Sequence, residues 1–342
     1  MQHGESVARD VAVVALTAIT TLVAGFGCAL ILEYLLIRAS RQFGWFAIPN
    51  ERSFHQAPTP SIGGLAIVLP VLAYLGYVSW TGVQAPLGLA LGGGVLALVG
   101  IRDDIKEVSA VLRFGCHILA VALVLWQLEL PYSFVVILCI GAALVWHVNL
   151  FNIMDGIDGL AGSQCLFYCL GVLWLAGDLP GWLGEMSWLL VGTAISFLVF
   201  NWPPARIFMG DVGSGFLGLV LAVLALEMAQ REFLPLVASL LLLAGFWFDA
   251  SYTLCVRILS GQKFTQAHRS HLYQNLAAKK GHQWTTLAYL IFAGTWLLPL
   301  AYLSLRFSQL NILWLALAVA PMAVAARYFE AGRPGPGNTV AA

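Results

Sequence analysis

The chain has 342 residues, of which 60% are hydrophobic and 10% are charged. Soluble globular domains carry about 25% charged residues, so this composition excludes an ordinary soluble protein and indicates an integral membrane protein. Seventeen basic and seventeen acidic residues give a net charge of zero, and we expect the lipid bilayer, not nucleic acid, as the main partner.

Long apolar runs predict membrane-spanning helices, because a hydrocarbon core of about 30 Å needs roughly 20 apolar residues per helix. Eleven spans are predicted, with ten as the alternative count, and no linker divides them. The predicted spans are 11–37, 61–80, 85–101, 113–130, 132–149, 159–177, 186–201, 214–229, 234–257, 284–304 and 311–327. We therefore expect an all-α polytopic membrane protein with a single transmembrane catalytic domain, 1–330, and a disordered cytoplasmic tail, 331–342.

Lys and Arg predict the orientation. Eleven spans place the termini on opposite sides, and three basic residues, Arg9, Arg231 and Arg306, then share the side of the N-terminus. The other fourteen lie on the opposite side, which is therefore expected to be cytoplasmic. The N-terminus would face outward. Every polar cluster discussed below lies on the predicted cytoplasmic side, so we expect an active site built from cytoplasmic loops.

The first two clusters are PNERSFHQAPTP and RDDIKEV. The first supplies Arg52 and His55 in a Pro-bounded loop. The second places Asp103 and Asp104 at the end of the third predicted span. Paired carboxylates repel each other, which favours a nearby cation or a shared proton. A solvated helix end is the alternative interpretation.

The third cluster, NLFNIMDGIDGL, is the most specific. Asn149, Asn152, Asp155 and Asp158 recur at every third position, so on a helix they would follow one slowly turning stripe. Asn152 and Asp155 could converge on one ion or one phosphate group. Polar groups at membrane depth are costly and indicate a functional site, with an ordinary Asx-rich turn as the alternative.

The fourth cluster, FMGDVGSG, places Asp211 just before the eighth predicted span. Asp211 could be a helix N-cap or a hard oxygen ligand, since Mg²⁺ takes one or two protein carboxylates and completes its shell with water and substrate phosphates. Arg206, shortly before it, is a candidate phosphate partner.

The fifth cluster contains HRSHLYQ. His268, Arg269 and His271 form a compact group of donors suited to phosphate oxygens. Zinc binding by the HxxH pair would require further ligands that the sequence does not supply. Asp249 lies inside the ninth predicted span, where a carboxylate is expected either to face the site or to form structural hydrogen bonds.

These motifs, in this order from about residue 49 to residue 276, resemble the polyprenyl-phosphate N-acetylhexosamine-1-phosphate transferases. That family includes undecaprenyl-phosphate GlcNAc-1-phosphate transferases and the phospho-MurNAc-pentapeptide translocase. The resemblance implies an enzyme of the bacterial plasma membrane that transfers a sugar 1-phosphate from a UDP-sugar to undecaprenyl phosphate and releases UMP. The version here is most similar to enzymes that initiate O-antigen or related surface glycans.

The resemblance also implies Mg²⁺ as cofactor, with Mn²⁺ as the alternative, and Asn152 and Asp211 as the metal ligands. The catalytic acids would be Asp103, Asp104, Asp155 and Asp211. The residues expected to bind substrate are Arg52, His55, Asn149, Arg206, Asp249, His268, Arg269 and His271. Dimers occur in the family, so both a monomer and a homodimer remain open.

One departure bears on the substrate. The pentapeptide translocases carry a Lys three positions after their acidic pair, whereas this chain has Glu107 there and Lys106 one position earlier. A peptide-bearing sugar is therefore the alternative, and GlcNAc, FucNAc and QuiNAc remain equal candidates. A membrane transporter of a polar solute is the other alternative. A CDP-alcohol phosphotransferase is disfavoured because LAGSQ, rather than Ala-Arg, follows DGIDG.

Overall fold

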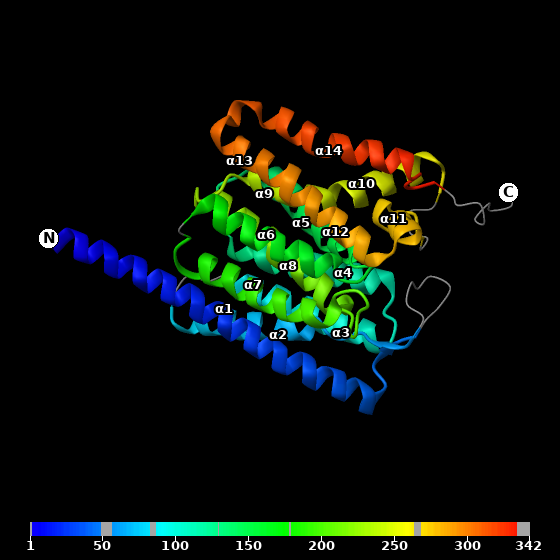
Figure 1. Ribbon diagram of the computed structural model, residues 1–342, viewed down its shortest axis with the longest axis horizontal. Coiled ribbons are helices and arrows are strands. Elements are labelled where there is room, and N and C mark those ends of the chain that lie inside the picture. Colours follow the sequence, from blue (N-terminus) through cyan, green and yellow to red (C-terminus); the bar gives the residue numbers. More distant parts are fainter. Residues whose placement is uncertain are drawn as a thin grey trace.

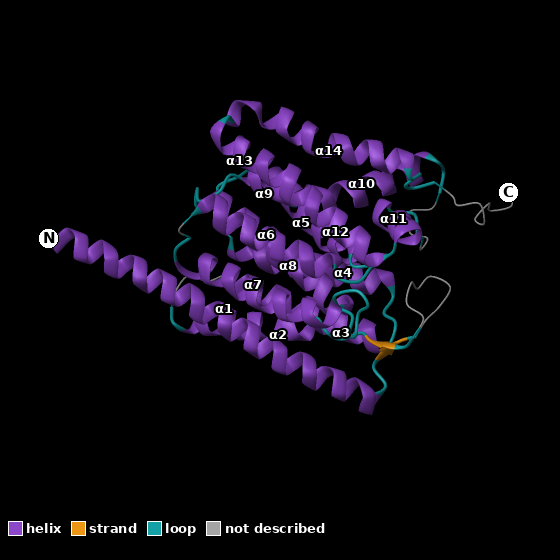
Figure 2. Ribbon diagram, viewed as in Figure 1, coloured by secondary structure: helices purple, strands orange, loops and turns teal. Residues whose placement is uncertain are grey.

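The computed structural model describes residues 2–48, 57–82, 87–128, 130–177, 179–262 and 268–333, with side chains described from residue 13 onward. The described chain is almost entirely helical, as predicted (Figures 1 and 2). The helices are α1 (Gln2–Phe43), α2 (Leu65–Trp80), α3 (Leu87–Ile105), α4 (Ala110–Gln127), α5 (Phe134–Met154), α6 (Leu160–Ala176), α7 (Gly181–Asn201), α8 (Gly210–Gln230), α9 (Leu236–Leu242), α10 (Ala244–Leu259), α11 (Leu272–Lys280), α12 (His282–Phe292), α13 (Leu298–Arg306) and α14 (Asn311–Tyr328). A π-helical turn, η1 (Ala293–Leu297), joins α12 to α13, and a 3₁₀ turn, η2 (Ser308–Leu310), precedes α14.

Most of these helices can cross a membrane. Within the described residues, seven helical segments are long and apolar enough, or eight if α9 and α10, which meet at a 73° bend, form one broken span. The protein is therefore a multi-pass membrane protein. Each of the eleven predicted spans has a helical counterpart. However, α2 and α6 are shorter apolar helices, and α3 ends in the charged sequence RDD, so the count of eleven is not confirmed.

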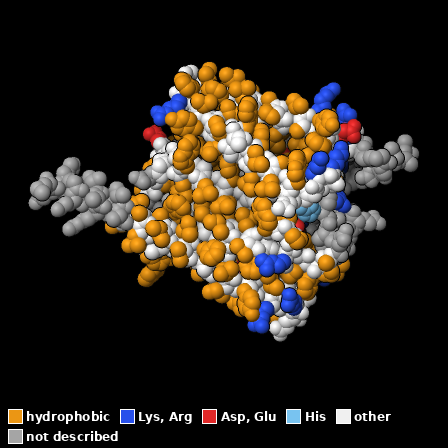
Figure 3. Space-filling view, in the orientation of Figure 1, with side chains coloured by type: hydrophobic (Ala, Val, Ile, Leu, Met, Phe, Trp, Pro, Cys, Tyr) orange, Lys and Arg blue, Asp and Glu red, His pale blue; other side chains and the backbone are white. Residues whose placement is uncertain are grey.

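Helix α8 forms the centre of the bundle. It is apolar around its whole circumference and almost every residue in it is buried, as expected of a helix enclosed by others. Its neighbours include α3 and α5, while α1 packs along α7 at the edge. The outer helices expose large apolar side chains such as Leu16, Leu98 and Val324. Figure 3 shows hydrophobic side chains covering the middle of one face, as contact with lipid would require.

The polar connections gather at one end of the bundle, on the right in Figure 1. Two short strands that the sequence did not predict, β1 (Phe46–Ala47) and β2 (Thr59–Pro60), form an antiparallel pair there, with Phe46 opposite Pro60. The α14 helix ends at this end of the bundle, whereas α1 starts at the other. This arrangement fits an odd number of crossings.

The first three residues of the predicted tail belong to the described chain. Residues 331–333 are held in place: Ala331 is buried, Gly332 N donates to Ser270 O at 2.8 Å, and Gln262 Nε2 donates to Gly332 O at 3.0 Å. Residues 334–342 lie outside the described chain. The end of α14 is therefore tied to the HRSH segment, 268–271, which the prediction of a free tail from residue 331 did not anticipate.

Candidate active site

A cavity of about 300 Å³ opens at the polar end of the bundle. It brings together the β1–β2 pair, the end of α3, the turn after α5, the loop before α8 and the start of α12. Its lining, among the described residues, is Ala47, Ser61, Asp104, Asn152, Asp155, Gly156, Ile157, Asp158, Asn201, Phe208, Met209, Gly210, Asp211 and His282. Three of the four predicted catalytic acids and both predicted metal ligands therefore share one cavity.

Asp211 lies in the first turn of α8 and contacts the end of α5. Its Oδ1 accepts a hydrogen bond from Asn152 Nδ2 at 2.8 Å. The same amide nitrogen donates to Ser214 Oγ, also at 2.8 Å. The Asn-x-x-Asp and Met-Gly-Asp motifs, almost 60 residues apart in the chain, thus meet in one polar contact. Their predicted proximity is reproduced by the structure.

Asp104 holds the beginning of α8. Its two carboxylate oxygens accept hydrogen bonds from the backbone amides of Asp211 at 2.9 Å and Val212 at 3.1 Å. Those amides belong to the first turn of a helix, where donors have no intrahelical partner. Gly210 makes this approach possible, because it adopts a φ of +72° and a Cβ there would collide with Ser61 O and lie 2.6 Å from Asp104 Oδ2.

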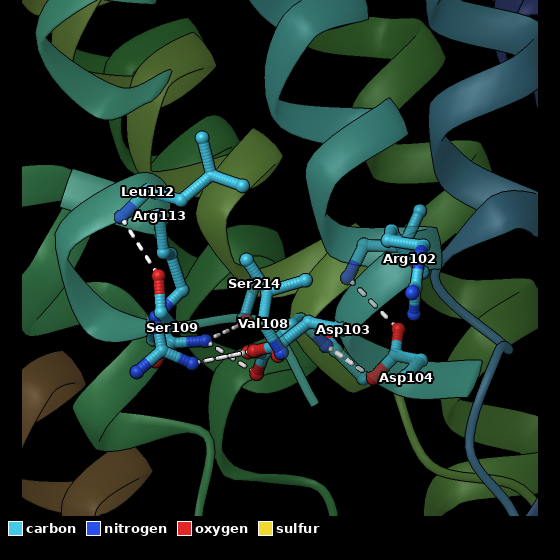
Figure 4. A network of polar contacts seen from close by, with 12 residues as sticks. Arg102, Asp103, Asp104, Val108, Ser109, Leu112, Arg113 and Ser214 are labelled. Atoms are coloured by element: carbon cyan, nitrogen blue, oxygen red, sulfur yellow. Dashed lines mark hydrogen bonds and ion pairs between the residues drawn. The ribbon is translucent and has the colours of Figure 1, made fainter. Parts of the chain in front are cut away.

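Arg113, at the start of α4, links two of the acids. Its Nη1 lies 2.5 Å from Asp103 Oδ2 and 3.1 Å from Asp211 Oδ2. Figure 4 shows Asp103 and Arg113 pointing toward each other, with Ser214 close by. Asp103 Oδ1 also accepts from Val108 N at 2.6 Å. Partial burial works to raise the pKa of Asp103, but hydrogen bonds involving Asp211, Val108 and Arg113 outweigh it and hold this pKa below its usual range.

The two other acids of the cavity that were predicted to be catalytic, Asp104 and Asp155, have raised pKa values. Burial, reinforced by the neighbouring charge of Asp211, raises the pKa of Asp104 to about 8, against the two backbone hydrogen bonds. Burial also raises the pKa of Asp155 well above its usual range, and Asp211, Asp104 and Asp158 raise it further. Like charges in a poorly solvated site disfavour ionisation. A bound cation would relieve this repulsion.

The opposite wall is formed by Asp158 and His282. Asp158 Oδ2 accepts from Ala205 N at 3.0 Å, and its Oδ1 lies 3.2 Å from His282 Nδ1. Thr286 Oγ1, one turn along α12, donates to the Asp158 carbonyl at 2.9 Å. The DGIDG turn is thereby fastened to both α12 and the loop before α8, which fixes the shape of the cavity on this side.

The HRSH segment does not contribute to the lining found among the described residues. His268 and His271 stack on each other with ring centroids 4.8 Å apart, and His271 is almost fully buried. Burial lowers the pKa of His268 to about 3, helped by His271 and Arg257, so this ring is neutral at physiological pH. Substrate contact by His268, Arg269 and His271 stays a prediction.

Asp249 is placed differently from the substrate-binding position expected of it. It is fully buried. Its Oδ1 accepts from Leu272 N at 2.8 Å, and its Oδ2 accepts from Tyr273 N at 2.9 Å and Tyr289 Oη at 2.6 Å. In this arrangement the carboxylate accepts structural hydrogen bonds, which is the alternative that the sequence left open, and substrate binding by Asp249 stays a prediction.

Two further candidates also point elsewhere. Asn149 Nδ2 donates to Val145 O, one turn back in its own helix, at 2.7 Å. Arg206 Nη2 donates to Val199 O at 2.6 Å, and its guanidinium covers the Phe200 ring. Neither side chain is part of the cavity lining. Arg52 and His55 lie outside the described residues.

The structure adds residues that the sequence did not single out for the site. Arg113 was counted only as a basic residue at the edge of a span, although its position ten residues after Asp103 and at the start of an apolar helix could have suggested a partner for the acidic pair. His282 had a weaker signal, as the first residue after Gly281. Asp158 was recognised within the polar stripe but was not assigned to the site.

The donor set suits magnesium. Asn152 and Asp211 offer an amide and a carboxylate side by side, with Asp155 in the same cavity. Within the described residues, no group of three or more His, Cys, Asp and Glu side chains is gathered closely enough to hold a metal by itself. Mg²⁺ uses few protein ligands and retains water and phosphate oxygens.

The sequence of this chain is similar to those of known proteins. The model of glycosyl transferase family 4 matches residues 86–229. A decaprenyl-phosphate N-acetylglucosaminephosphotransferase of Mycobacterium leprae is 30% identical, over 72% of this chain and 73% of its own length. A probable undecaprenyl-phosphate N-acetylglucosaminyl 1-phosphate transferase of Bacillus subtilis is 28% identical over 73% of this chain and 74% of its own. The chain belongs to glycosyl transferase family 4.

A third relative in this group is the undecaprenyl-phosphate alpha-N-acetylglucosaminyl 1-phosphate transferase of Escherichia coli K12, 26% identical over 75% of this chain and 76% of its own length. The glycosyl transferase family 4 match runs from the residue before α3 to the penultimate residue of α8. It therefore spans Asp103, Arg113, Asn152, Asp155 and Asp211. The expected resemblance to polyprenyl-phosphate N-acetylhexosamine-1-phosphate transferases is confirmed.

The capping role of Asp104 leads to a prediction about stability. Replacing Asp104 by Ala leaves the amides of Asp211 and Val212 without their acceptor, which should lower the free energy of unfolding by about 1–2 kcal/mol. Thermal unfolding of the purified protein in detergent measures this. Ser109→Ala removes the weaker 3.4 Å cap of α4 and should cost less. Equal stability of Asp104→Ala and the unmodified protein would contradict the assignment.

Proposed function

We propose that this protein transfers N-acetylhexosamine 1-phosphate, or a 6-deoxy N-acetylhexosamine 1-phosphate, from a UDP-sugar to undecaprenyl phosphate. The products would be UMP and undecaprenyl-diphosphate-sugar, the first lipid intermediate of an O-antigen or related surface polysaccharide. The observation that carries the proposal is the acid cavity that unites Asp104, Asn152, Asp155 and Asp211 at one end of a membrane bundle. The names of the relatives describe the same class of reaction.

The location of the cavity suits one soluble and one lipid substrate. We infer that the polar end of the bundle faces the cytoplasm of a bacterial plasma membrane, since fourteen of the seventeen Lys and Arg residues belong to the predicted inner connections. Eleven crossings, with α9 and α10 as a broken ninth span, agree with this orientation. A polyprenyl tail would lie among the outer helices while its phosphate reaches the cavity.

In the proposed reaction, a phosphate oxygen of undecaprenyl phosphate attacks the phosphorus that bears the sugar. The new P–O bond forms as the bond from that phosphorus to the bridging oxygen breaks, and the electron pair leaves with UMP. A phosphate monoester has its second pKa near 6, so the attacking group is mostly a dianion at neutral pH. Little general-base assistance is needed, and catalysis rests on positioning and charge neutralisation.

The residues of the site divide these tasks. Arg113 brings positive charge to the junction of Asp103 and Asp211 and would offset the charge of an incoming phosphate. Asp104 fixes the start of α8 and thus the position of Asp211. Asp103, held ionised beside Arg113, would fix the position of the guanidinium, and the guanidinium would orient the lipid phosphate.

Asn152 and Asp211 would hold Mg²⁺, with Asp155 close by in the same cavity. The bound ion would supply Lewis-acid stabilisation of the diphosphate and of departing UMP. The raised pKa values of Asp104 and Asp155, caused first by burial and then by neighbouring carboxylates, support this proposal, because a divalent cation would stabilise the ionised forms of both side chains.

The decisive experiment is an assay of the purified protein in detergent with undecaprenyl phosphate, Mg²⁺ and a panel of donors. UDP-GlcNAc, UDP-linked 6-deoxy N-acetylhexosamines and UDP-MurNAc-pentapeptide should each be tried. We expect one of the simple sugars to give UMP and lipid-linked sugar in equal amounts, with loss of both products on chelation and recovery on adding Mg²⁺. Turnover of the pentapeptide donor alone would favour the translocase alternative. Folded protein that releases no UMP from any donor would refute the proposal.

A further inference from the structure

Helix α11 begins beside the active site, and its start is fixed by a buried carboxylate. Asp249 on α10 accepts hydrogen bonds from the amides of Leu272 and Tyr273, the first two residues of α11. Tyr289 on α12 donates to the same carboxylate at 2.6 Å. Three helices therefore meet at one buried acid. The Tyr273 backbone is held at a defined place relative to α10 and α12.

The side chain of Tyr273 extends from this anchor to the catalytic turn. The ring is fully buried, and its hydroxyl donates to Ile153 O at 2.7 Å. Ile153 directly follows Asn152 in the last turn of α5, where carbonyls lack intrahelical partners. Burial raises the pKa of Tyr273 above its usual range, so the phenol keeps its proton and remains a donor.

Gly156 completes this contact. A Cβ at position 156 would collide with the Tyr273 hydroxyl oxygen and would lie 3.0 Å from Cζ and 3.2 Å from Cε2. The tip of the phenol therefore rests against the backbone immediately after Asp155. The contact at Ile153 and the contact at Gly156 enclose Met154 and Asp155 between them, so the phenol supports the turn that carries the cavity acid.

The other face of Tyr273 is joined to the HRSH segment. The His271 ring stacks on the Tyr273 ring with centroids 5.8 Å apart and an interplanar angle of 25°. His268 stacks in turn on His271. One continuous aromatic stack thus connects the two histidines, which the sequence predicts to grip phosphate, with the turn that follows Asn152.

We propose that Tyr273 is a positioning residue that sets the spacing between the HRSH segment and the turn 152–156. This inference rests on the proposed transferase function and on the predicted contact of the HRSH segment with the donor diphosphate. Tyr273 is not part of the cavity lining. It acts through Ile153 and Gly156 on one side and through His271 on the other.

The first test is Tyr273→Phe, which removes the hydroxyl and leaves the ring stack. Without its bond to Ile153 O, the turn should shift away from its productive position, and displacements of about 1 Å can cost up to about 100-fold in rate. We expect kcat for UMP release to fall by at least about 10-fold, with KM for the UDP-sugar changed by less than about 3-fold, as for an interaction needed mainly in the transition state.

Tyr168→Phe is the matched control. Tyr168 is equally buried, and its hydroxyl donates to Ser239 Oγ at 3.3 Å, away from the cavity. It should keep the kcat of the unmodified protein. A wild-type kcat in Tyr273→Phe, or an equal loss in Tyr168→Phe, would overturn the assignment.

A pair of substitutions tests the contact itself. Gly156→Ala should greatly reduce kcat, because its Cβ meets the Tyr273 hydroxyl oxygen. Removing that oxygen relieves the closest contact and leaves only the tight contacts with Cζ and Cε2, so the double variant Gly156→Ala with Tyr273→Phe should be more active than Gly156→Ala alone, by about 5-fold or more. A double variant no more active than Gly156→Ala would overturn the proposal.

Hydrogen–deuterium exchange separates this inference from the proposed function, because it requires no turnover. In detergent-purified Tyr273→Phe, the amides of residues 155–159 should exchange faster than in the unmodified protein, while those of α6 beyond its first turn should not change. If the unmodified protein releases UMP and exchange at 155–159 is the same in Tyr273→Phe, the positioning role alone is refuted. If exchange is faster in Tyr273→Phe but the unmodified protein releases no UMP from any donor, the transferase proposal is refuted and the contact made by Tyr273 remains supported.

Discussion

Replacing Asp211 by Asn is expected to abolish sugar-phosphate transfer while leaving the protein folded in the membrane. The carboxylate faces Asn152 through Oδ1 and Arg113 through Oδ2, so it lies where both the proposed metal site and the cationic partner of the acids meet. An amide of equal size keeps the shape and removes the charge. The loss in kcat should reach about 10³-fold, the magnitude associated with removing a central electrostatic contact from an active site.

UMP release by the purified variant, at saturating Mg²⁺, is the measurement for Asp211→Asn. Glu330→Gln provides a control in which a carboxylate of the same end of the bundle, paired only loosely with Arg333 at 3.7 Å, becomes an amide. That variant should retain full activity. Near-normal turnover by a folded Asp211→Asn protein would rule out a metal-binding role for Asp211.

Replacing Arg113 by Met is expected to be the second most damaging change. Arg113 supplies the positive charge shared by Asp103 and Asp211, and without it two carboxylates would repel each other and an incoming phosphate. Two unit charges about 4 Å apart interact by about 4 kcal/mol at an effective dielectric constant of 20. Because Arg113 is partly exposed to solvent, only part of this applies, and we expect kcat to fall by about 10²-fold.

The Arg113 prediction is checked by comparing three variants in the same UMP assay. Arg113→Lys retains the charge as a single compact group that cannot reproduce the fork of a guanidinium, so its activity should lie between those of Arg113→Met and the unmodified protein. Arg102→Met removes a neighbouring exposed cation that donates to Lys106 O, and it should remain active. If Arg102→Met were as impaired as Arg113→Met, a general loss of surface charge would explain the effect instead.

The sequence was sufficient to predict the class of fold and the acids of the cavity. Apolar runs long enough to span a bilayer leave few places for Asp104, Asn152, Asp155 and Asp211, and counting crossings places all four at the same end. The resemblance to a known family then gave these residues a chemistry. Both inferences depend on patterns along the sequence. These patterns predict the arrangement in space because a chain that spans a membrane crosses it as successive helices.

The partners of those acids could not be predicted in the same way. Arg113 reaches Asp103 and Asp211 because α4 packs against α3 at a particular rotation, and the sequence of α4 alone does not reveal which neighbouring helix Arg113 faces. Asp249 was equally ambiguous, since a carboxylate within a span can face a substrate or backbone amides. The hydrogen bonds that Asp249 accepts from the amides of Leu272 and Tyr273 depend on α11, a segment that the sequence predicted to be a loop.

Helix α8 has a consequence for how the enzyme meets its membrane. Protein surrounds it along most of its length, so the depth of Asp211 is set by neighbouring helices and not by the thickness of the lipid. Exposed helices such as α1 must tilt or deform when the bilayer becomes thicker or thinner. We therefore expect the reaction centre to stay at constant height in membranes of different composition, while the periphery of the bundle absorbs the mismatch.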